Sequence, residues 1–152
     1  MGKQKDFPPR RRQVSKEREE RILMLPREEI ERVATILVDS MVRVHRELGP
    51  GLLESTSQKC LAHELGKRGI SVRCEVDLPV RYDGLEIAVG YRIDMIVGGC
   101  VVVENKSVQS ILPVHEAQIL THLKLSGHKL GFPVNWNVPL IRDGMKRLVN
   151  NL

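Results

Sequence analysis

Three charged residues close to two neighbouring predicted strands have types and a spacing that suit chemistry on a phosphate group. Val101–Lys106 is an apolar, β-type run that ends in Glu104 and Lys106. Side chains two residues apart on a strand point to the same face, so this acid and this lysine lie side by side. Asp94 closes the preceding run, before a Gly-Gly pair, so an aspartate, a glutamate and a lysine can meet across one hairpin.

The chemistry that such a trio supports is metal-dependent hydrolysis. Two carboxylates that converge on one spot repel each other unless a cation lies between them, so Asp94 and Glu104 predict a metal site. Oxygen ligands without a matching cysteine or histidine cluster favour Mg²⁺ or Mn²⁺ over Zn²⁺. The cation could activate a water that attacks a phosphodiester, and Lys106 could orient that water. The alternative interpretation is a cross-strand salt bridge at the end of a strand pair.

The register of the hairpin decides whether the three side chains meet. A two-residue loop at the Gly-Gly pair would place Asp94 on the sheet face away from Glu104. A three-residue connection, or a bulge with a left-handed glycine, would place Asp94 opposite Val102 and on the face that Glu104 shares. We predict this second register.

Further polar residues could complete the site. Glu54 begins the second predicted helix, where the helix dipole favours an acid, so capping alone would explain it. His115, Gln118 and His122 are spaced i, i+3 and i+7 and form a polar stripe on an otherwise apolar helix. Gln118 both donates and accepts hydrogen bonds, so it could hold a water or a phosphate oxygen at the rim. His45 lies in an apolar helical stripe and is either a core histidine or an accessory site residue.

Periodicity predicts the elements that position these residues. Helical spacing covers Arg27–Leu48 and residues 52–68. Alternating apolar and polar residues then predict three strands in an antiparallel meander, starting at Val72, with a hairpin turn at residues 83–84 and a bulge at Gly90. The second strand covers 85–97 and the third 100–106.

The remaining elements complete an α/β domain. Pro113 opens a helix that runs to about residue 126. A strand at 129–136 follows, and Pro133 makes it an edge strand or gives it a bulge. A short helix at 143–149 ends the chain. The order α, α, β, β, β, α, β, α predicts a mixed sheet flanked by helices.

Length and composition favour one soluble domain behind a basic tail. The chain has 152 residues and a net charge of +5. Residues 1–21 hold eight Lys and Arg against four Asp and Glu, which gives +4 of that charge. We predict a flexible tail at 1–26, either solvated or holding nucleic acid through phosphate contacts, and a domain at 27–152. The chain has neither a membrane-spanning apolar stretch nor a secretory signal, and its three cysteines lack zinc-site spacing, so we expect a cytoplasmic protein with reduced cysteines.

Five ordered motifs resemble a known family. They are the run from residue 44 to 54, residues 90–94 (Gly-Tyr-Arg-Ile-Asp), residues 103–106 (Val-Glu-Asn-Lys), residues 115–123, and residues 135–137 (Asn-Trp-Asn). In this order and spacing they resemble the GxxExxY family, which is grouped with the PD-(D/E)XK nuclease superfamily. The similarity covers residues 28–150.

The resemblance implies a restriction-endonuclease-like αβββαβ core and a Mg²⁺- or Mn²⁺-dependent nuclease. It makes Asp94 and Glu104 the metal-binding acids and Lys106 the catalytic lysine. Glu54 would be an accessory acid that also binds the metal, and Gln118 a further site residue. His115 also matches the family, without a defined role.

Three positions depart from the family pattern. Ser57 stands where the naming motif has Tyr, Asn105 where an apolar residue is usual, and His122 where Tyr is commoner. Asn105 is expected on the strand face opposite Glu104. None of the three belongs to the predicted catalytic set, but the missing Tyr removes an aromatic ring on which a base could stack.

We therefore expect hydrolysis of nucleic acid, with DNA favoured over RNA as the partner and no membrane. A homodimer could form through the edge near Pro133. Two alternatives belong to other classes. One is a catalytically silent, nuclease-like module that binds nucleic acid or protein, and the other is a small structural or assembly protein whose polar cluster is a salt-bridge network.

Overall fold

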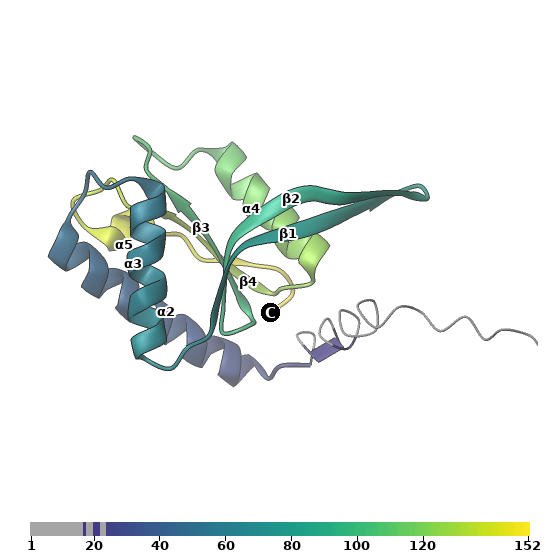
Figure 1. The fold of residues 1–152 in the computed structure, drawn as a ribbon, viewed down its shortest axis with the longest axis horizontal. Coiled ribbons are helices and arrows are strands. Elements are labelled where there is room, and N and C mark those ends of the chain that lie inside the picture. The colour runs from purple at the N-terminus through teal and green to yellow at the C-terminus, as the bar shows by residue number, and fades with distance from the viewer. Residues whose placement is uncertain (1–16, 18–19, 22–23) are drawn as a thin grey trace, which may run out of the picture.

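A computed structural model describes residues 17, 20–21 and 24–152. Most of the predicted basic tail at 1–26 therefore lies outside the described residues. Figure 1 shows the ribbon, whose elements are α2 (Arg27–Leu48), α3 (Glu54–Lys67), β1 (Val72–Tyr82), β2 (Leu85–Val97), β3 (Val101–Lys106), α4 (Pro113–Ser126), β4 (Leu130–Asn135), α5 (Ile141–Gly144) and β5 (Leu148–Val149). Among the described residues, no helix is both long and apolar enough to cross a membrane.

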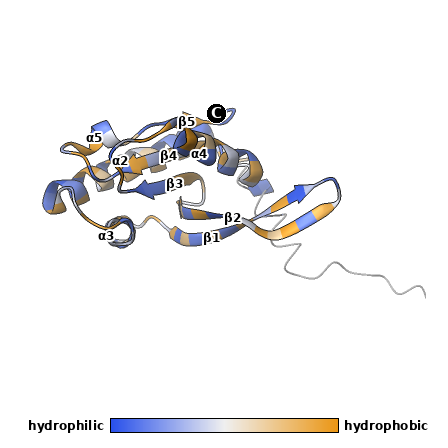
Figure 2. Cartoon of the chain, turned by 90° about the horizontal axis from the view of Figure 1, so that it is seen from above, coloured by the Kyte–Doolittle hydropathy of each residue, from blue (hydrophilic) through white to orange (hydrophobic). Residues whose placement is uncertain are grey.

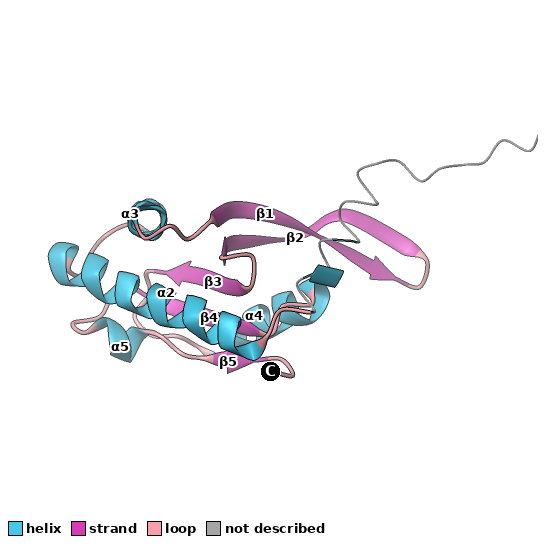
Figure 3. Cartoon of the chain, turned by 90° about the horizontal axis from the view of Figure 1, so that it is seen from below, coloured by secondary structure: helices cyan, strands magenta, loops and turns pink. Residues whose placement is uncertain are grey.

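The strands form one mixed sheet in the order β1-β2-β3-β4-β5. β3 and β4 run parallel, and the other neighbours pair antiparallel. Helices flank the sheet on both sides (Figure 3). The predicted meander of β1, β2 and β3 and the α/β class with a mixed sheet are confirmed.

β3 separates two hydrophobic cores. Val101 and Val103 pack with α2 and α3, whereas Val102 packs with Ile119 and Leu123 of α4. Each face of this strand is therefore covered, which is why its sequence is a continuous apolar run. By the same alternation, Glu104 belongs to the α4 side and Asn105 to the α2–α3 side.

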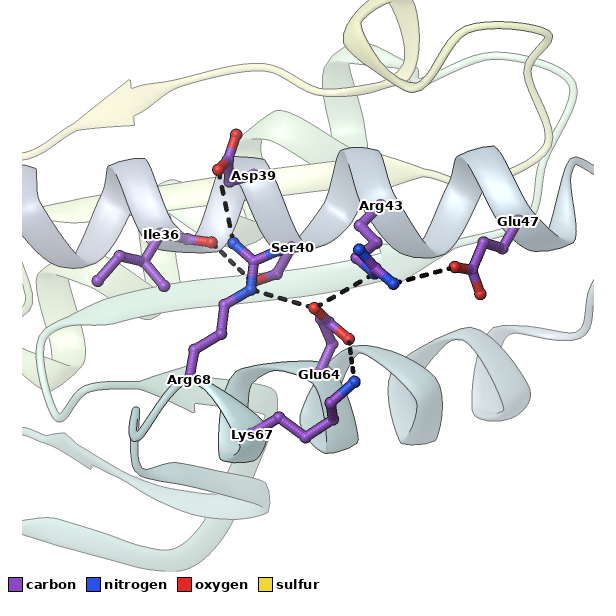
Figure 4. Close-up of polar contacts among 8 residues, drawn as sticks. All are labelled: Ile36, Asp39, Ser40, Arg43, Glu47, Glu64, Lys67 and Arg68. Carbon is purple, nitrogen blue, oxygen red and sulfur yellow. Dashed lines mark hydrogen bonds and ion pairs between the residues drawn. The ribbon is translucent and has the colours of Figure 1, made fainter.

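Ion pairs join α2 to α3 on the outer surface (Figure 4). Glu64 of α3 pairs with Arg43, Lys67 and Arg68, and Arg68 also pairs with Asp39 of α2. Burial would raise the pKa of Glu64, but the hydrogen bond from Arg68 and the nearby positive charges lower it below its usual value. These arginines are therefore engaged in holding the helices together.

β1 and β2 extend beyond the body as a hairpin arm (Figure 1). Its turn residues Asp83 and Gly84 both have positive φ, 45° and 78°, as a two-residue hairpin loop requires. The strand register shifts between Leu78 and Val80, opposite Gly90, so the predicted bulge is confirmed. Figure 2 shows hydrophobic residues along this arm.

Two predictions about the C-terminal region are wrong. β4 is an inner strand, because β5 pairs with Leu130 and Gly131. The nitrogen of Pro133, which cannot donate a hydrogen bond, lies beyond the two residues of β4 that pair with β5. It is on the side of β4 where the carbonyl oxygen of Pro133 accepts the N–H of Lys146. The predicted helix at 143–149 is also absent: α5 ends at Gly144, and residues 148–149 instead satisfy backbone groups of β4.

Candidate active site

The β2–β3 hairpin has the three-residue connection that the sequence predicts. Val97 pairs with Val101 across Gly98, Gly99 and Cys100, and both glycines have positive φ, 58° and 70°. Met95 pairs with Val103. Continued by one residue, this register places Asp94 opposite Glu104, and not opposite Val102 as predicted. The shared face is confirmed, and the two acids are direct cross-strand neighbours.

Asp94 lies at a break in the pairing of β1 with β2. Cys74 pairs with Met95 and Val76 with Ile93, whereas Glu75 and Asp94 between them are unpaired. Glu75 has a φ of 52°, an uncommon backbone conformation for a non-glycine residue. On either side of Asp94, Ile93 packs in the α4 core and Met95 in the α2–α3 core. The acid therefore occupies the point where the hairpin arm departs from the sheet.

The carboxyl groups of Asp94 and Glu104 interact directly. Burial, the negative charge of Glu104 and the hydrogen-bonding contact with its carboxyl group raise the pKa of Asp94 to about 7. The backbone N–H of Asn105 donates to Oδ2 of Asp94 at 2.9 Å and opposes this shift. Two acids so placed are a high-energy pair when both are ionised, and a cation between them would remove that repulsion.

The sequence analysis placed His122 in a polar stripe but did not identify it as a partner of Glu104. Its Nδ1 lies 2.7 Å from Oε1 of Glu104, and both side chains are buried. The ring of Tyr91 meets the His122 ring edge-on, with centroids 5.3 Å apart. The sequence did contain an indication of this role: His122 lies between Ile119 and Leu123, at a helix position that faces the core and would ordinarily be apolar.

Lys106 follows Glu104 by two residues on β3 and is half-buried. Among the ion pairs of the described residues, none includes Lys106, whereas Glu104 pairs with His122. The cross-strand salt bridge considered for this trio is therefore absent. The lysine is free to meet a negatively charged group brought by a substrate.

Glu54 joins the start of α3 to the end of β3. Its Oε1 accepts the N–H of Ser107 at 3.0 Å, and the Ser107 hydroxyl donates to the carbonyl of Leu52 at 3.1 Å. The carboxylate thus tethers the chain just beyond Lys106. Within the described part of the chain, no three His, Cys, Asp or Glu residues are grouped to hold a metal ion, so Glu54 does not join Asp94 and Glu104 in such a cluster.

The predicted polar stripe of α4 has three different environments. His115 accepts the N–H of Leu112 on its Nδ1 at 3.0 Å, and so caps its own helix. Gln118 is exposed and lies one turn before His122, on the same side of the helix. Only His122 touches a predicted metal ligand in the described structure.

His45 lies apart from the carboxylates, on the α2 side of the sheet. Its side chain is buried, and its ring centroid is 6.3 Å from that of Trp136. Trp136 belongs to the α2–α3 core, whereas Glu104 faces His122 of α4. The structure therefore does not bring His45 to the carboxylate pair.

The donor chemistry of this site fits a hard divalent cation. Mg²⁺ prefers oxygen ligands, keeps several waters, and is commonly held in proteins by one or two carboxylates together with substrate phosphates. Asp94 and Glu104 supply two carboxylates in contact, held by the Asn105 N–H and by His122 respectively. The arrangement can therefore place a cation, a phosphate and the Lys106 ammonium group at one end of β3.

Replacing Asp94 with asparagine is expected to stabilise the metal-free protein at pH 8 by about 1–2 kcal/mol. The raised pKa means that the folded state retains the Asp94 proton up to about pH 7, whereas the unfolded chain loses it near 3.8. The stability linked to this proton is present below pH 3.8 and is lost as the pH rises through 7. An asparagine amide carries no charge and can donate to Glu104. The figure is modest because Asp94 is partly exposed and water screens its charge.

Urea denaturation in EDTA at pH 8 and pH 4 measures this difference. The gain should disappear at pH 4, where wild-type Asp94 is protonated. Asp77→Asn is the matched control, since Asp77 is an exposed acid on the same hairpin, paired with Arg92. A loss of stability in Asp94→Asn at pH 8 would contradict the proposed repulsion between the two acids.

Comparison with known proteins agrees with the class of site. The family model for the PD-(D/E)XK nuclease superfamily matches residues 31–148, a range that contains Asp94, Glu104 and Lys106. No curated protein and no solved structure matches the chain.

Proposed function

The chain belongs to the PD-(D/E)XK nuclease superfamily, and on that premise we propose that it hydrolyses phosphodiester bonds of nucleic acid at the Asp94–Glu104 pair. The superfamily suggests nuclease activity and nucleic acid as the partner. The observation that carries the proposal is the contact between two carboxyl groups at the end of β3, beside a lysine that pairs with no acid among the described residues.

In this proposal Asp94 and Glu104 would hold Mg²⁺ or Mn²⁺, which when bound supplies a Lewis acid and lowers the pKa of a coordinated water. The N–H of Asn105 positions Asp94, and His122 positions Glu104. Hydrogen-bonded supports of this kind orient metal ligands in proteins generally. Lys106 would orient the attacking water or offset negative charge that develops on the phosphate.

Two further residues have supporting roles in the proposal. Glu54 keeps the segment after Lys106 in place through its bond to Ser107, and is an accessory acid that could bind the metal once nucleic acid is present. Gln118, exposed on the His122 side of α4, would contact a water or a phosphate oxygen at the rim.

The finer assignments are also proposals. The five ordered motifs support the GxxExxY branch of the superfamily, although Ser57 replaces the Tyr of the naming motif. Ser57 is fully buried, and its hydroxyl has no partner among the described residues. DNA is favoured over RNA as the substrate, with the basic N-terminal tail assisting through phosphate contacts. A homodimer would present two such sites to a duplex.

Plasmid nicking by the full chain tests the proposal. Wild-type protein should nick supercoiled DNA in Mg²⁺ or Mn²⁺ and stop in EDTA, and Glu104→Gln should not nick. Glu86→Gln, on the hairpin arm away from the carboxylates, is the control and should cleave normally. Nicking that persists in Glu104→Gln would show that the assignment is wrong.

Thermal unfolding with and without the metal separates the nuclease from its alternative. Metal ions that bind the folded state raise the melting temperature, and this rise should be lost in Glu104→Gln. A metal-dependent rise without any cleavage of DNA or RNA would instead support the catalytically silent binding module.

A further inference from the structure

A cavity of about 530 Å³ lies between the C-terminal half of α2 and the segment leading into α5. Arg46 and Arg142 line it together with His45, and Val42, Leu140 and Ile141 supply an apolar wall. No acidic side chain is among the lining residues. Its size is within the range of about 300–1,000 Å³ that small-molecule sites have.

The two arginines of this cavity differ from most of the other arginines that the structure describes. Seven arginines of the described region pair with acids. Neither Arg46 nor Arg142 has an acidic partner or a side-chain hydrogen bond among the described residues. Both are exposed, so their guanidinium groups are available to a ligand. An uncompensated pair of arginines beside an acid-free cavity favours an anion.

His45 provides an independent indication of a ligand. Its side chain is only 5% exposed, and its Nε2 is buried without a hydrogen-bond partner in the described structure. A buried polar atom without a partner costs free energy, so such atoms call for an explanation. His45 also lines the cavity, and a rotation of its ring would bring the unpartnered nitrogen to a polar group of a ligand there.

We propose that this cavity binds an organic phosphate of the nucleotide class. Arg46 and Arg142 would hold the phosphate, since guanidinium groups bind phosphate oxygens in pairs of hydrogen bonds. The apolar wall would take the ring part, and His45 would meet a polar atom of it. Inorganic phosphate alone would leave most of the volume unfilled. The site goes beyond the proposed nuclease activity, because it lies on the α2 side of the sheet whereas Glu104 faces α4.

Isothermal titration calorimetry of the full chain with the four nucleoside 5′-monophosphates tests the proposal. The titrations are made in EDTA and at low salt, so that metal-dependent binding at the carboxylates does not contribute. Wild-type protein and Asp94→Asn should bind at least one mononucleotide equally well. Arg46→Gln and Arg142→Gln should each bind about tenfold more weakly or worse, because each loses charged hydrogen bonds to the phosphate. Arg81→Gln, an exposed arginine of the hairpin arm, is the charge-matched control and should bind as wild type does.

The phosphate could belong to a free nucleotide or to the end of a nucleic-acid strand, and oligonucleotides separate these sources. Preferential binding of a 5′-phosphorylated oligonucleotide over its 5′-hydroxyl form, lost in Arg142→Gln, would assign the site to a strand end. Binding of mononucleotides alone would assign it to a free ligand. The proposal is overturned if neither a mononucleotide nor a 5′-phosphate is bound, or if the two arginine variants bind as wild type. Nuclease activity in Asp94→Asn plays no part in these outcomes, so the two proposals fail separately.

Discussion

Replacing Lys106 with methionine is expected to slow metal-dependent cleavage by about two to three orders of magnitude while leaving the fold intact. Loss of one group that stabilises transition-state charge typically has an effect of this size. Lys106 has no acidic partner among the described residues, so its removal breaks no ion pair. The free energy of unfolding should change by less than about 0.5 kcal/mol. Catalysis and stability are therefore separable at this position.

Single-turnover cleavage and urea denaturation of the same preparations measure the two effects. Lys124→Met on α4 is the matched control, because Lys124 is also a lysine without an acidic partner among the described residues but is exposed. The metal-dependent rise in melting temperature should persist in Lys106→Met, since Asp94 and Glu104 are unchanged. Wild-type cleavage rates in Lys106→Met would remove this lysine from the proposed reaction. A large loss of stability would instead assign it a structural role.

Replacing Asn105 with valine is expected to lower the free energy of unfolding by about 2–4 kcal/mol. Asn105 is 1% exposed, and its Oδ1 accepts the indole N–H of Trp136 at 2.9 Å. Its Nδ2 donates to Oε1 of Gln58 at 3.3 Å and contacts the sulfur of Met95 at 3.2 Å. An apolar residue, as the family usually has here, would leave the buried indole N–H of this protein without a partner. The predicted placement of Asn105 on the face opposite Glu104 is confirmed by these contacts.

A double-mutant cycle with Trp136→Phe tests whether the two residues act as a pair. Trp136→Phe removes the N–H that Asn105 accepts, so the double variant should lose about 1–2 kcal/mol less than the sum of the single losses. Asn137→Val is the surface control, because Asn137 is exposed and close by. Strictly additive losses in urea denaturation would show that the hydrogen bond contributes little beyond the packing of the tryptophan.

Local sequence patterns were sufficient to predict most of the helices, strands and turns. Arg27–Leu48, the Asp83-Gly84 turn, the Gly90 bulge and the three-residue connection after β2 agree with their sequence-based predictions. Each depends on neighbours within a few residues, through helical spacing, strand alternation or the glycine preference for positive φ. Alternation together with the predicted three-residue connection was sufficient to place Asp94 and Glu104 on one face.

Prediction failed where a segment takes its structure from a distant partner. Residues 143–149 have a short apolar pattern that suits a helix, yet Leu148 and Val149 pair with β4. The unpaired backbone of β4 outweighs the weak helical preference of so short a segment. Pro133 likewise suggested an edge strand, since proline cannot donate a backbone hydrogen bond. That prediction failed because the sequence does not show that β5 pairs with β4.

For the candidate site, the sequence by itself determined which acids and which lysine share the end of one hairpin. Only the tertiary structure decided their partners: His122 on Glu104, the Asn105 N–H on Asp94, Glu54 on Ser107, and no acid on Lys106 among the described residues. Glu54 and Ser107 are 53 residues apart and Glu104 and His122 are 18 apart. Strand alternation acts between adjacent residues, so it determines the direction of each side chain. Which group a side chain then meets depends on how helices from elsewhere in the chain pack on the sheet.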